Sequence, residues 1–184
     1  MDDIKDRLGD YKYNYFKNLQ NYLDTDLYFY GSIKRPDYFK NASDIDIAII
    51  SDNINSILTK LQNYLNIKRS DIKKIYQKFH GKSETIIVGY KIKYQDKEKD
   101  FSYDILIYDE KYRKPVIENL NDINNLPSYI VTILIFIKIL YYLLGIISKQ
   151  MYLDLKNCLF YMYFNNTFKF YYDKKDYTTI VLDI

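Results

Sequence analysis

The stretch YGSIKRPDYFKNASDIDIAI, residues 30–49, decides the fold. A Gly-Ser pair, Gly31 and Ser32, ends a short apolar run, and the stretch closes on a second run in which aspartate alternates with isoleucine. Side chains alternate across a β-strand, so Asp44 and Asp46 project from one face while the isoleucines project from the other. We therefore expect the isoleucines in the core and the two carboxylates close together on an accessible face.

A later segment repeats the pattern, because Asp104 stands among apolar residues in FSYDILIYD, residues 101–109. If both strands turn their apolar faces to the same helices, Asp104 joins Asp44 and Asp46. Neighbouring carboxylates repel each other unless a cation lies between them, and three of them can hold two hard divalent ions. The competing interpretation, surface charges on an edge strand, does not explain the alternation with isoleucine. The three aspartates are therefore candidate metal ligands.

The Gly-Ser pair adds a candidate phosphate site. A glycine directly after a strand lets the backbone turn sharply and approach a ligand, and the serine supplies a hydroxyl and an N–H donor. A Gly-Ser pair alone is common. The specific signal is the series of strand, Gly-Ser, eleven residues, Asp-x-Asp within a strand, and a third aspartate within a later strand.

Composition limits the class of protein. The chain has 184 residues, 48% of them apolar and 28% charged, which is typical of one globular domain with or without a helical appendage. A single cysteine, Cys158, excludes an internal disulfide and a cysteine-cluster metal site and suits a reducing compartment, so we expect a cytoplasmic protein. The first residues lack the apolar core of a secretory signal. A net charge of +3 is far below that of nucleic-acid binders driven by charge.

Hydrophobic periodicity predicts the other elements. Helices are expected at residues 2–23, 54–65 and 70–79, and strands at 27–31, 44–50, 85–94 and 101–109, the last two forming an antiparallel hairpin. Asp52 or Asn53 caps the second helix and Ser70 the third. After Pro127 the chain turns helical, at 129–147 and again from Ser148. The inward residues of that last helix are expected to be Met151, Tyr152, Leu155, Leu159 and Met162.

These elements predict an α+β (α/β) fold: a small mixed sheet backed by helices on one face, followed by an α-helical C-terminal part. The expected division is a domain of residues 1–113 that carries the sheet and a helical subdomain of residues 114–184. The apolar segment 129–147 is nearly long enough to span a bilayer, but Lys138 at its centre would cost about 2.5–3.5 kcal/mol there. We expect a core helix covered on all sides and no membrane, with a membrane-anchored protein as the alternative.

With these residues the chain resembles the DNA polymerase beta superfamily of nucleotidyltransferases. The resemblance implies transfer of a nucleotidyl group from a nucleoside triphosphate to an acceptor hydroxyl, with two Mg²⁺ (or Mn²⁺) ions. It implies that Gly31 and Ser32 hold the β and γ phosphates and that Asp44 and Asp46 hold both metals. Asp104 would complete the metal that activates the acceptor and would receive its proton.

The resemblance also bears on the basic residues. It implies a phosphate contact for Lys138, whereas a lysine at the edge of the core with its ammonium in solvent is the commoner case. Lys34, Arg35 and Lys40 are expected in a solvated loop, with a contact to triphosphate or acceptor as the alternative. Many members follow Gly-Ser with a small residue and then Arg-Gly. Here Pro36 intervenes, so the helix after the turn is expected to be short or distorted.

The acceptor has three candidates: an RNA end, a protein or a small molecule. No RNA-recognition signature or long basic run selects among them. A function of another class stays open, a catalytically silent nucleotide-binding or scaffold protein that keeps the fold. The sequence carries no signal for base preference or oligomeric state.

Overall fold

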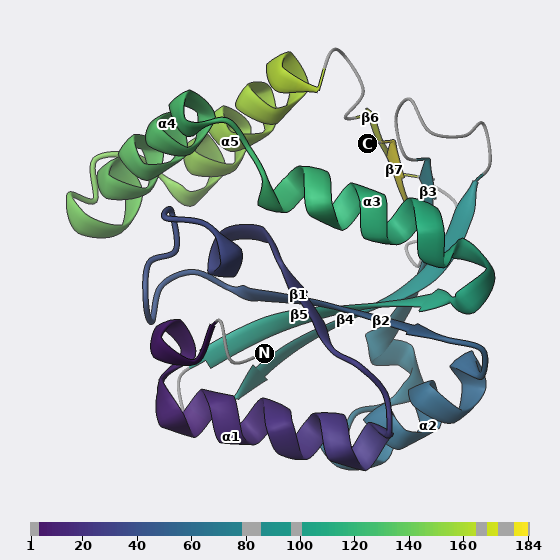
Figure 1. The fold of residues 1–184 in the computed structure, drawn as a ribbon. Helices are drawn as coiled ribbons and strands as arrows, with labels where there is room; N and C mark the ends of the chain where they lie inside the picture. The colour runs from purple at the N-terminus through teal and green to yellow at the C-terminus, as the bar shows by residue number, and fades with distance from the viewer. Residues whose placement is uncertain (1–3, 79–85, 97–100, 165–168, 173–178, 184) are drawn as a thin grey trace.

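The computed structural model describes residues 4–78, 86–96, 101–164, 169–172 and 179–183. They form a mixed sheet with helices on both faces (Figure 1), which confirms the predicted α+β class. The strand order is β1-β2-β5-β4-β3-β7-β6, with β2 parallel to β5, β3 parallel to β7 and the other neighbours antiparallel. The strands are β1 (Tyr28–Tyr30), β2 (Ile45–Ser51), β3 (Ile72–Lys78), β4 (Ile87–Asp96), β5 (Phe101–Asp109), β6 (Lys169–Tyr172) and β7 (Thr179–Asp183).

Two helices, α1 (Lys5–Leu23) and α2 (Ile54–Leu65), cover one face of the sheet (Figure 1). Ile45, Ile47 and Ile49 of β2 point into this layer and are fully buried, as their alternation with aspartate predicts. Of the two candidate caps of α2, the structure selects Asn53, whose side chain accepts a hydrogen bond from the N–H of Ser56. The carboxylate-bearing face is therefore turned away from these helices.

The opposite face is covered by α3 (Arg113–Asn124), which the periodicity did not reveal. Its residues Val116 and Leu120 pack against apolar side chains of β2 and β5. The chain then forms a helical hairpin from α4 (Ser128–Lys138), a π-helical turn (Ile139–Leu143) and α5 (Lys149–Tyr163), which lies beside α3 in Figure 1. The first helix after residue 113 thus packs on the sheet and not on the helical hairpin alone. The division into two parts at residue 113 stays a prediction.

The prediction of a helix at residues 70–79 was wrong over residues 70–78, and residue 79 lies outside the described residues. A short 3₁₀ turn (Arg69–Asp71) leads into β3, which pairs with β4 along Ile72 to Gln77. The apolar spacing of this segment fits either element, and the β-branched Ile72 and Ile75 favour a strand once β4 offers a pairing edge. Ile75 is fully buried in the sheet.

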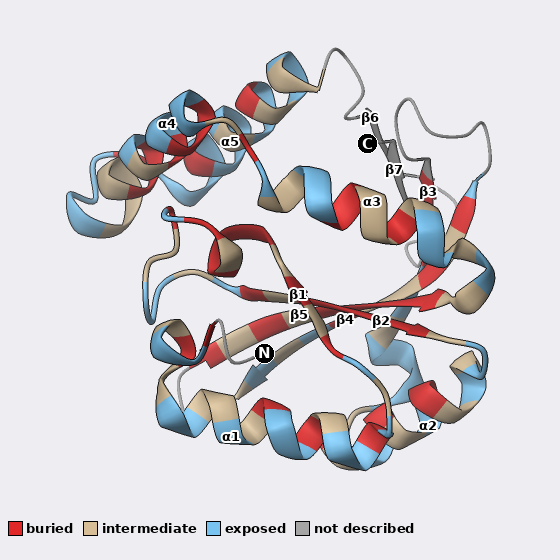
Figure 2. Cartoon of the chain, in the orientation of Figure 1, coloured by how far each residue is buried: buried red, intermediate tan, exposed pale blue. Residues whose placement is uncertain are grey.

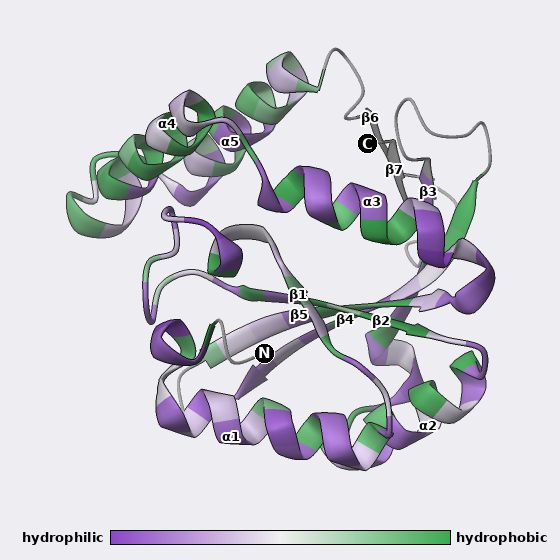
Figure 3. Ribbon diagram, viewed as in Figure 1, coloured by the Kyte–Doolittle hydropathy of each residue, from purple (hydrophilic) through white to green (hydrophobic). Residues whose placement is uncertain are grey.

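The helical hairpin is covered less completely than predicted. On α4 one stripe is buried, but Tyr129, Ile133 and Phe136 on the other side are exposed. Figure 2 shows exposed positions along the whole hairpin, and Figure 3 shows that many of the hairpin residues are hydrophobic. On α5, Tyr152 and Leu159 face inward as predicted, whereas Met151, Leu155 and Met162 are exposed. The reason is that α5 packs through one stripe only, which leaves Met151, Leu155 and Met162 outside that contact. Within the described residues no single helix meets the length and hydropathy of a membrane span, and only the pair Glu110–Asn124 and Ser128–Leu143, bent by 70°, meets them together.

Candidate active site

A cavity of about 370 Å³ lies between the sheet and α5. Asp46 and Asp104 lie on its floor, directly opposite each other in the parallel pairing of β2 with β5. They share the sheet face that carries α3, as the alternation along both strands predicts. Asp44, one residue before β2, lines the same cavity and is exposed. The volume is in the range of sites that bind small molecules.

The Gly31 turn forms another wall of the cavity. Gly31 has φ +75°, and a Cβ on it would lie 2.6 Å from Oδ2 of Asp46, so glycine is required both by the backbone and by the neighbouring carboxylate. Its N–H donates a hydrogen bond of 3.0 Å to Oδ1 of Asn124 on α3. Ser32 follows, buried in the same wall.

The turn after Gly31 is a single 3₁₀ turn (Gly31–Lys34) and not an α-helix. It ends because Arg35 takes an extended conformation, with φ −116° and ψ 163°, as residues before a proline do. The expectation of a short helix at Pro36 is confirmed.

Asp46 lies in an environment that disfavours its negative charge. Burial raises the pKa of Asp46 to about 6, and the negative charges of Asp104 and Asp44 act in the same direction. The positive charges of Lys156 and Lys91 oppose that rise. The negative charges of the three aspartates thus lie close together in a partly buried cavity. A bound cation stabilises such an arrangement.

Asp104 is held by two lysines of β4. Its Oδ2 lies 2.7 Å from Nζ of Lys91 and 3.7 Å from Nζ of Lys93. Asp44 accepts a hydrogen bond from the hydroxyl of Ser102 on β5. The three carboxylates therefore share one cavity but differ in their partners: lysines for Asp104, a serine hydroxyl for Asp44 and mainly burial for Asp46.

Comparison with known families identifies the class of this protein. A family model described as a nucleotidyltransferase domain matches residues 14–148, well over half of the chain. The chain belongs to this family. It is part of the polymerase beta superfamily, which confirms the resemblance seen in the sequence and supports nucleotidyl transfer from a nucleoside triphosphate in general terms. No curated protein and no solved structure matches the chain.

Nucleotidyltransferases generally use divalent metals, so the donor set has to be tested against one. Among the described residues, no three acidic, histidine or cysteine side chains are arranged to hold a metal ion as they stand. The chemistry of the donors nevertheless fits Mg²⁺ or Mn²⁺, because Asp44, Asp46 and Asp104 offer only hard oxygen ligands. Space beside Asp46 is kept open by the missing Cβ of Gly31. These three aspartates are the residues that would hold the metal.

Lys138 lines the cavity, but its ammonium is already bonded within the protein. It donates to the carbonyl oxygen of Asp37 at 2.6 Å and lies 3.0 Å from Oδ2 of the same residue. Arg35 binds the same carboxylate through Nε and Nη2, at 2.8 and 3.1 Å. Lys138 therefore ties α4 to the loop after the Gly31 turn.

The three charges of this cluster are buried, with exposed fractions of 0% for Asp37, 4% for Lys138 and 5% for Arg35. The expectation that Arg35 lies in a solvated loop was wrong, because Asp37, two residues later, pairs with it inside the protein. Burial alone would raise the pKa of Asp37, but the hydrogen bond and charge of Arg35, with those of Lys138, lower it. Burial lowers the pKa of Lys138, and Asp37 offsets part of that effect.

Sequence reasoning missed Lys156, which lines the cavity from α5 opposite the aspartates. Its Nζ lies 5.9 Å from the ring centre of Phe160, and its charge lowers the pKa of Asp46. The signal was present in the sequence, since Tyr152, Lys156 and Phe160 follow each other at four-residue steps and so share one side of the helix.

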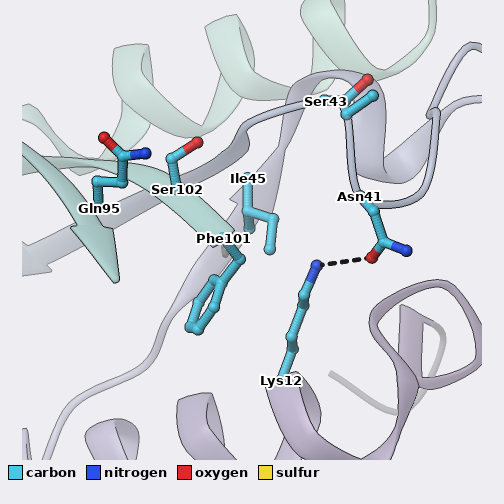
Figure 4. A pocket seen from close by; sticks show the side chains of 8 residues that line it. Lys12, Asn41, Ser43, Ile45, Gln95, Phe101 and Ser102 are labelled. Carbon is cyan, nitrogen blue, oxygen red and sulfur yellow. Dashed lines mark hydrogen bonds between the residues drawn. The ribbon is translucent and has the colours of Figure 1, made fainter. Parts of the chain in front are cut away.

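A smaller pocket of about 70 Å³ adjoins the cavity that the aspartates line (Figure 4). Ser43 lines both, and Ser102, the donor to Asp44, lines the smaller one. Lys12 reaches in from α1 and donates a hydrogen bond of 3.2 Å to Oδ1 of Asn41. The smaller pocket, with its polar lining, therefore extends the cavity from Asp44 toward α1.

Proposed function

We propose that this protein transfers a nucleoside monophosphate from a nucleoside triphosphate to an acceptor hydroxyl, with divalent metal held by Asp44, Asp46 and Asp104. The observation that carries the proposal is the pairing of Asp46 with Asp104 on adjacent parallel strands, directly beside the Gly31 turn. Carboxylates on the floor and a glycine turn in the wall give one cavity both a metal-binding side and a phosphate-binding side.

The residues divide the work of the reaction. Bound Mg²⁺ or Mn²⁺ would supply neutralisation of the phosphate charge and a lowered pKa of the acceptor hydroxyl. Ser32 and the backbone of the Gly31 turn orient the β and γ phosphates. The hydroxyl oxygen of the acceptor bonds to the α-phosphorus, and Asp104 receives the hydroxyl proton. The bond between the α-phosphorus and the oxygen that bridges it to the β-phosphate breaks, which releases pyrophosphate. Catalysis then consists mainly of positioning and charge stabilisation.

We assign the contact to the triphosphate from the helical part to Lys156 in preference to Lys138. Both line the cavity, but the ammonium of Lys138 already binds Asp37, whereas Lys156 faces the aspartates from α5. A lysine is a point charge suited to phosphate oxygens. Lys138 then serves the site by holding the loop that follows the Gly31 turn.

The test is transfer of label from each α-³²P nucleoside triphosphate, with Mg²⁺ or Mn²⁺, into total RNA, protein or small molecules of a lysate. Label is expected to move with the wild type, to be lost with Asp46→Asn, and to persist with Asp26→Asn, a matched change of an exposed aspartate. The fraction that becomes labelled names the acceptor class. Triphosphate binding without transfer would assign the silent nucleotide-binding role, and absence of metal-dependent binding would overturn the proposed site.

A further inference from the structure

Lys91 of β4 makes a contact that the proposed reaction does not explain. Its Nζ lies 2.7 Å from Oδ2 of Asp104, a short charge-assisted hydrogen bond. The side chains of Lys91 and Asp104 are 21% and 16% exposed, so solvent screens this pair less than a surface pair. Lys93 approaches the same oxygen only to 3.7 Å and is 71% exposed. Lys91 is therefore the main counter-ion of this carboxylate.

The strand register shows that the side chain of Lys91 extends diagonally across β4 and β5 to make this contact. Lys93 stands directly across from Asp104, whereas Lys91 stands across from Leu106, one diagonal step away on the same face. Lys91 reaches the carboxylate along the floor of the cavity, where Asp46 lies on the other side of Asp104. Two adjacent carboxylates without a cation repel each other, and the ammonium offsets part of that repulsion.

A divalent ion held by Asp104 would bind the same negatively charged carboxylate that Lys91 contacts. An ammonium and a metal ion bound to one carboxylate oxygen would face each other at close range, and like charges at such distances in a partly buried place are strongly disfavoured. Binding of the metal and the contact of Lys91 with Asp104 are thus alternatives.

We propose that Lys91 is the counter-ion of Asp104 in the metal-free protein and that a divalent metal must displace it, so that Lys91 sets the metal affinity of the site. This inference rests on the proposed metal-dependent function. Lys91 is a positioning residue, because it acts through Asp104. The contact of Lys91 with Asp104 offsets the repulsion among the aspartates before the metal and the nucleotide arrive.

The test measures Mn²⁺ binding to the full chain, without nucleotide, by isothermal titration calorimetry. Neutral Lys91→Gln and Lys91→Met are expected to bind Mn²⁺ about tenfold more tightly than the wild type, because the competing charge is gone. Lys91→Arg keeps a cation and is expected to stay within about threefold of the wild type. The matched control, Lys93→Gln, is expected to change the affinity by less than about threefold, because that lysine is exposed.

Thermal unfolding gives a second readout that does not depend on activity. Without metal, Lys91→Gln is expected to melt below the wild type, because Asp104 and Asp46 lose their neutralising charge. Saturating Mn²⁺ is expected to raise its melting temperature more than that of the wild type. A purely structural lysine would lower the melting temperature with and without metal and would leave the Mn²⁺ affinity unchanged or weaker.

The outcomes separate this inference from the proposed function. Equal or weaker Mn²⁺ binding by both neutral variants, with a wild-type circular dichroism spectrum, overturns the role of Lys91 and leaves the metal-dependent transfer standing. Binding by the neutral variants alone supports the role of Lys91 and counts against metal-dependent transfer by the wild type. No binding by any of the proteins overturns both.

Discussion

Replacing Asp37 with alanine removes the one negative charge from a buried cluster that keeps two positive charges. Arg35 and Lys138 are then left without the carboxylate they share, in a place where both are at most 5% exposed. The variant tests whether this cluster joins the helical hairpin to the Gly31 turn.

The size of the effect follows from the contacts. Three charge-assisted bonds are lost, at 2.8, 3.1 and 3.0 Å. Breaking a buried ion pair by removing one partner costs about 3–5 kcal/mol, because the other charge stays buried and uncompensated. For a chain of this size that corresponds to a fall in melting temperature of about 6–20 °C.

Urea unfolding followed by circular dichroism measures this change, with Asp26→Ala as the control at an exposed site, expected within about 0.5 kcal/mol of the wild type. The double variant Asp37→Ala with Lys138→Met is expected to lose less than the sum of the two single variants, because the two side chains interact directly. A loss below about 1 kcal/mol for Asp37→Ala would refute the reasoning, since the two cations would then have found other partners or solvent.

The same cluster predicts a pH dependence. The pKa of Asp37 in the folded protein lies below its ordinary value, so the carboxylate stabilises the fold at pH values above about 4. That contribution is lost as the pH falls through the folded pKa, because the folded state must then take up a proton it resists. Wild-type stability is therefore expected to fall below about pH 4 more steeply than that of Asp37→Ala, and equal slopes would contradict the assignment.

Substitutions at Gly31, Asn53 and Phe16 test the site, a helix cap and the core. Gly31→Ala is expected to abolish metal-dependent triphosphate binding, because the new Cβ would meet the carboxylate of Asp46. The control is Gly145→Ala, at a glycine with a similar positive φ and open space around it, which is expected to cost only about 1 kcal/mol of stability. Asn53→Ala is expected to cost about 1 kcal/mol in urea unfolding and Asn53→Asp almost nothing, since aspartate caps a helix equally well. Phe16→Ala, at a fully buried ring, is expected to cost about 3–5 kcal/mol, and a loss near zero would place this ring outside the core.

Local patterns predicted the floor of the site. Strand alternation is a property of single strands, so the faces of Asp46 and Asp104 follow from their neighbours, and the parallel pairing of β2 with β5 then brings the two residues together. The series of Gly-Ser, Asp-x-Asp and a third aspartate in a later strand carried the family resemblance, and the family match confirms that resemblance.

Long-range pairing was out of reach of the sequence. Lys138 and Asp37 lie 101 residues apart, and no periodicity connects them. The segment that forms β3 has apolar spacing suited to a short helix, and only the edge offered by β4 selects the strand. The helix α3 is mostly polar, with few apolar residues to mark its packed side, so its place on the sheet came only from the structure.

The path of the chain through the helical hairpin bears on how far α5 can move away from the carboxylates of the cavity. After α5 the chain returns to the sheet, where β7 pairs with β3, so the hairpin is attached at both of its ends. Lys138 fastens it to Asp37 at a third point. Any movement of α5 away from the sheet would have to break the contacts of Lys138 with Asp37, so the width of the cavity is expected to vary little.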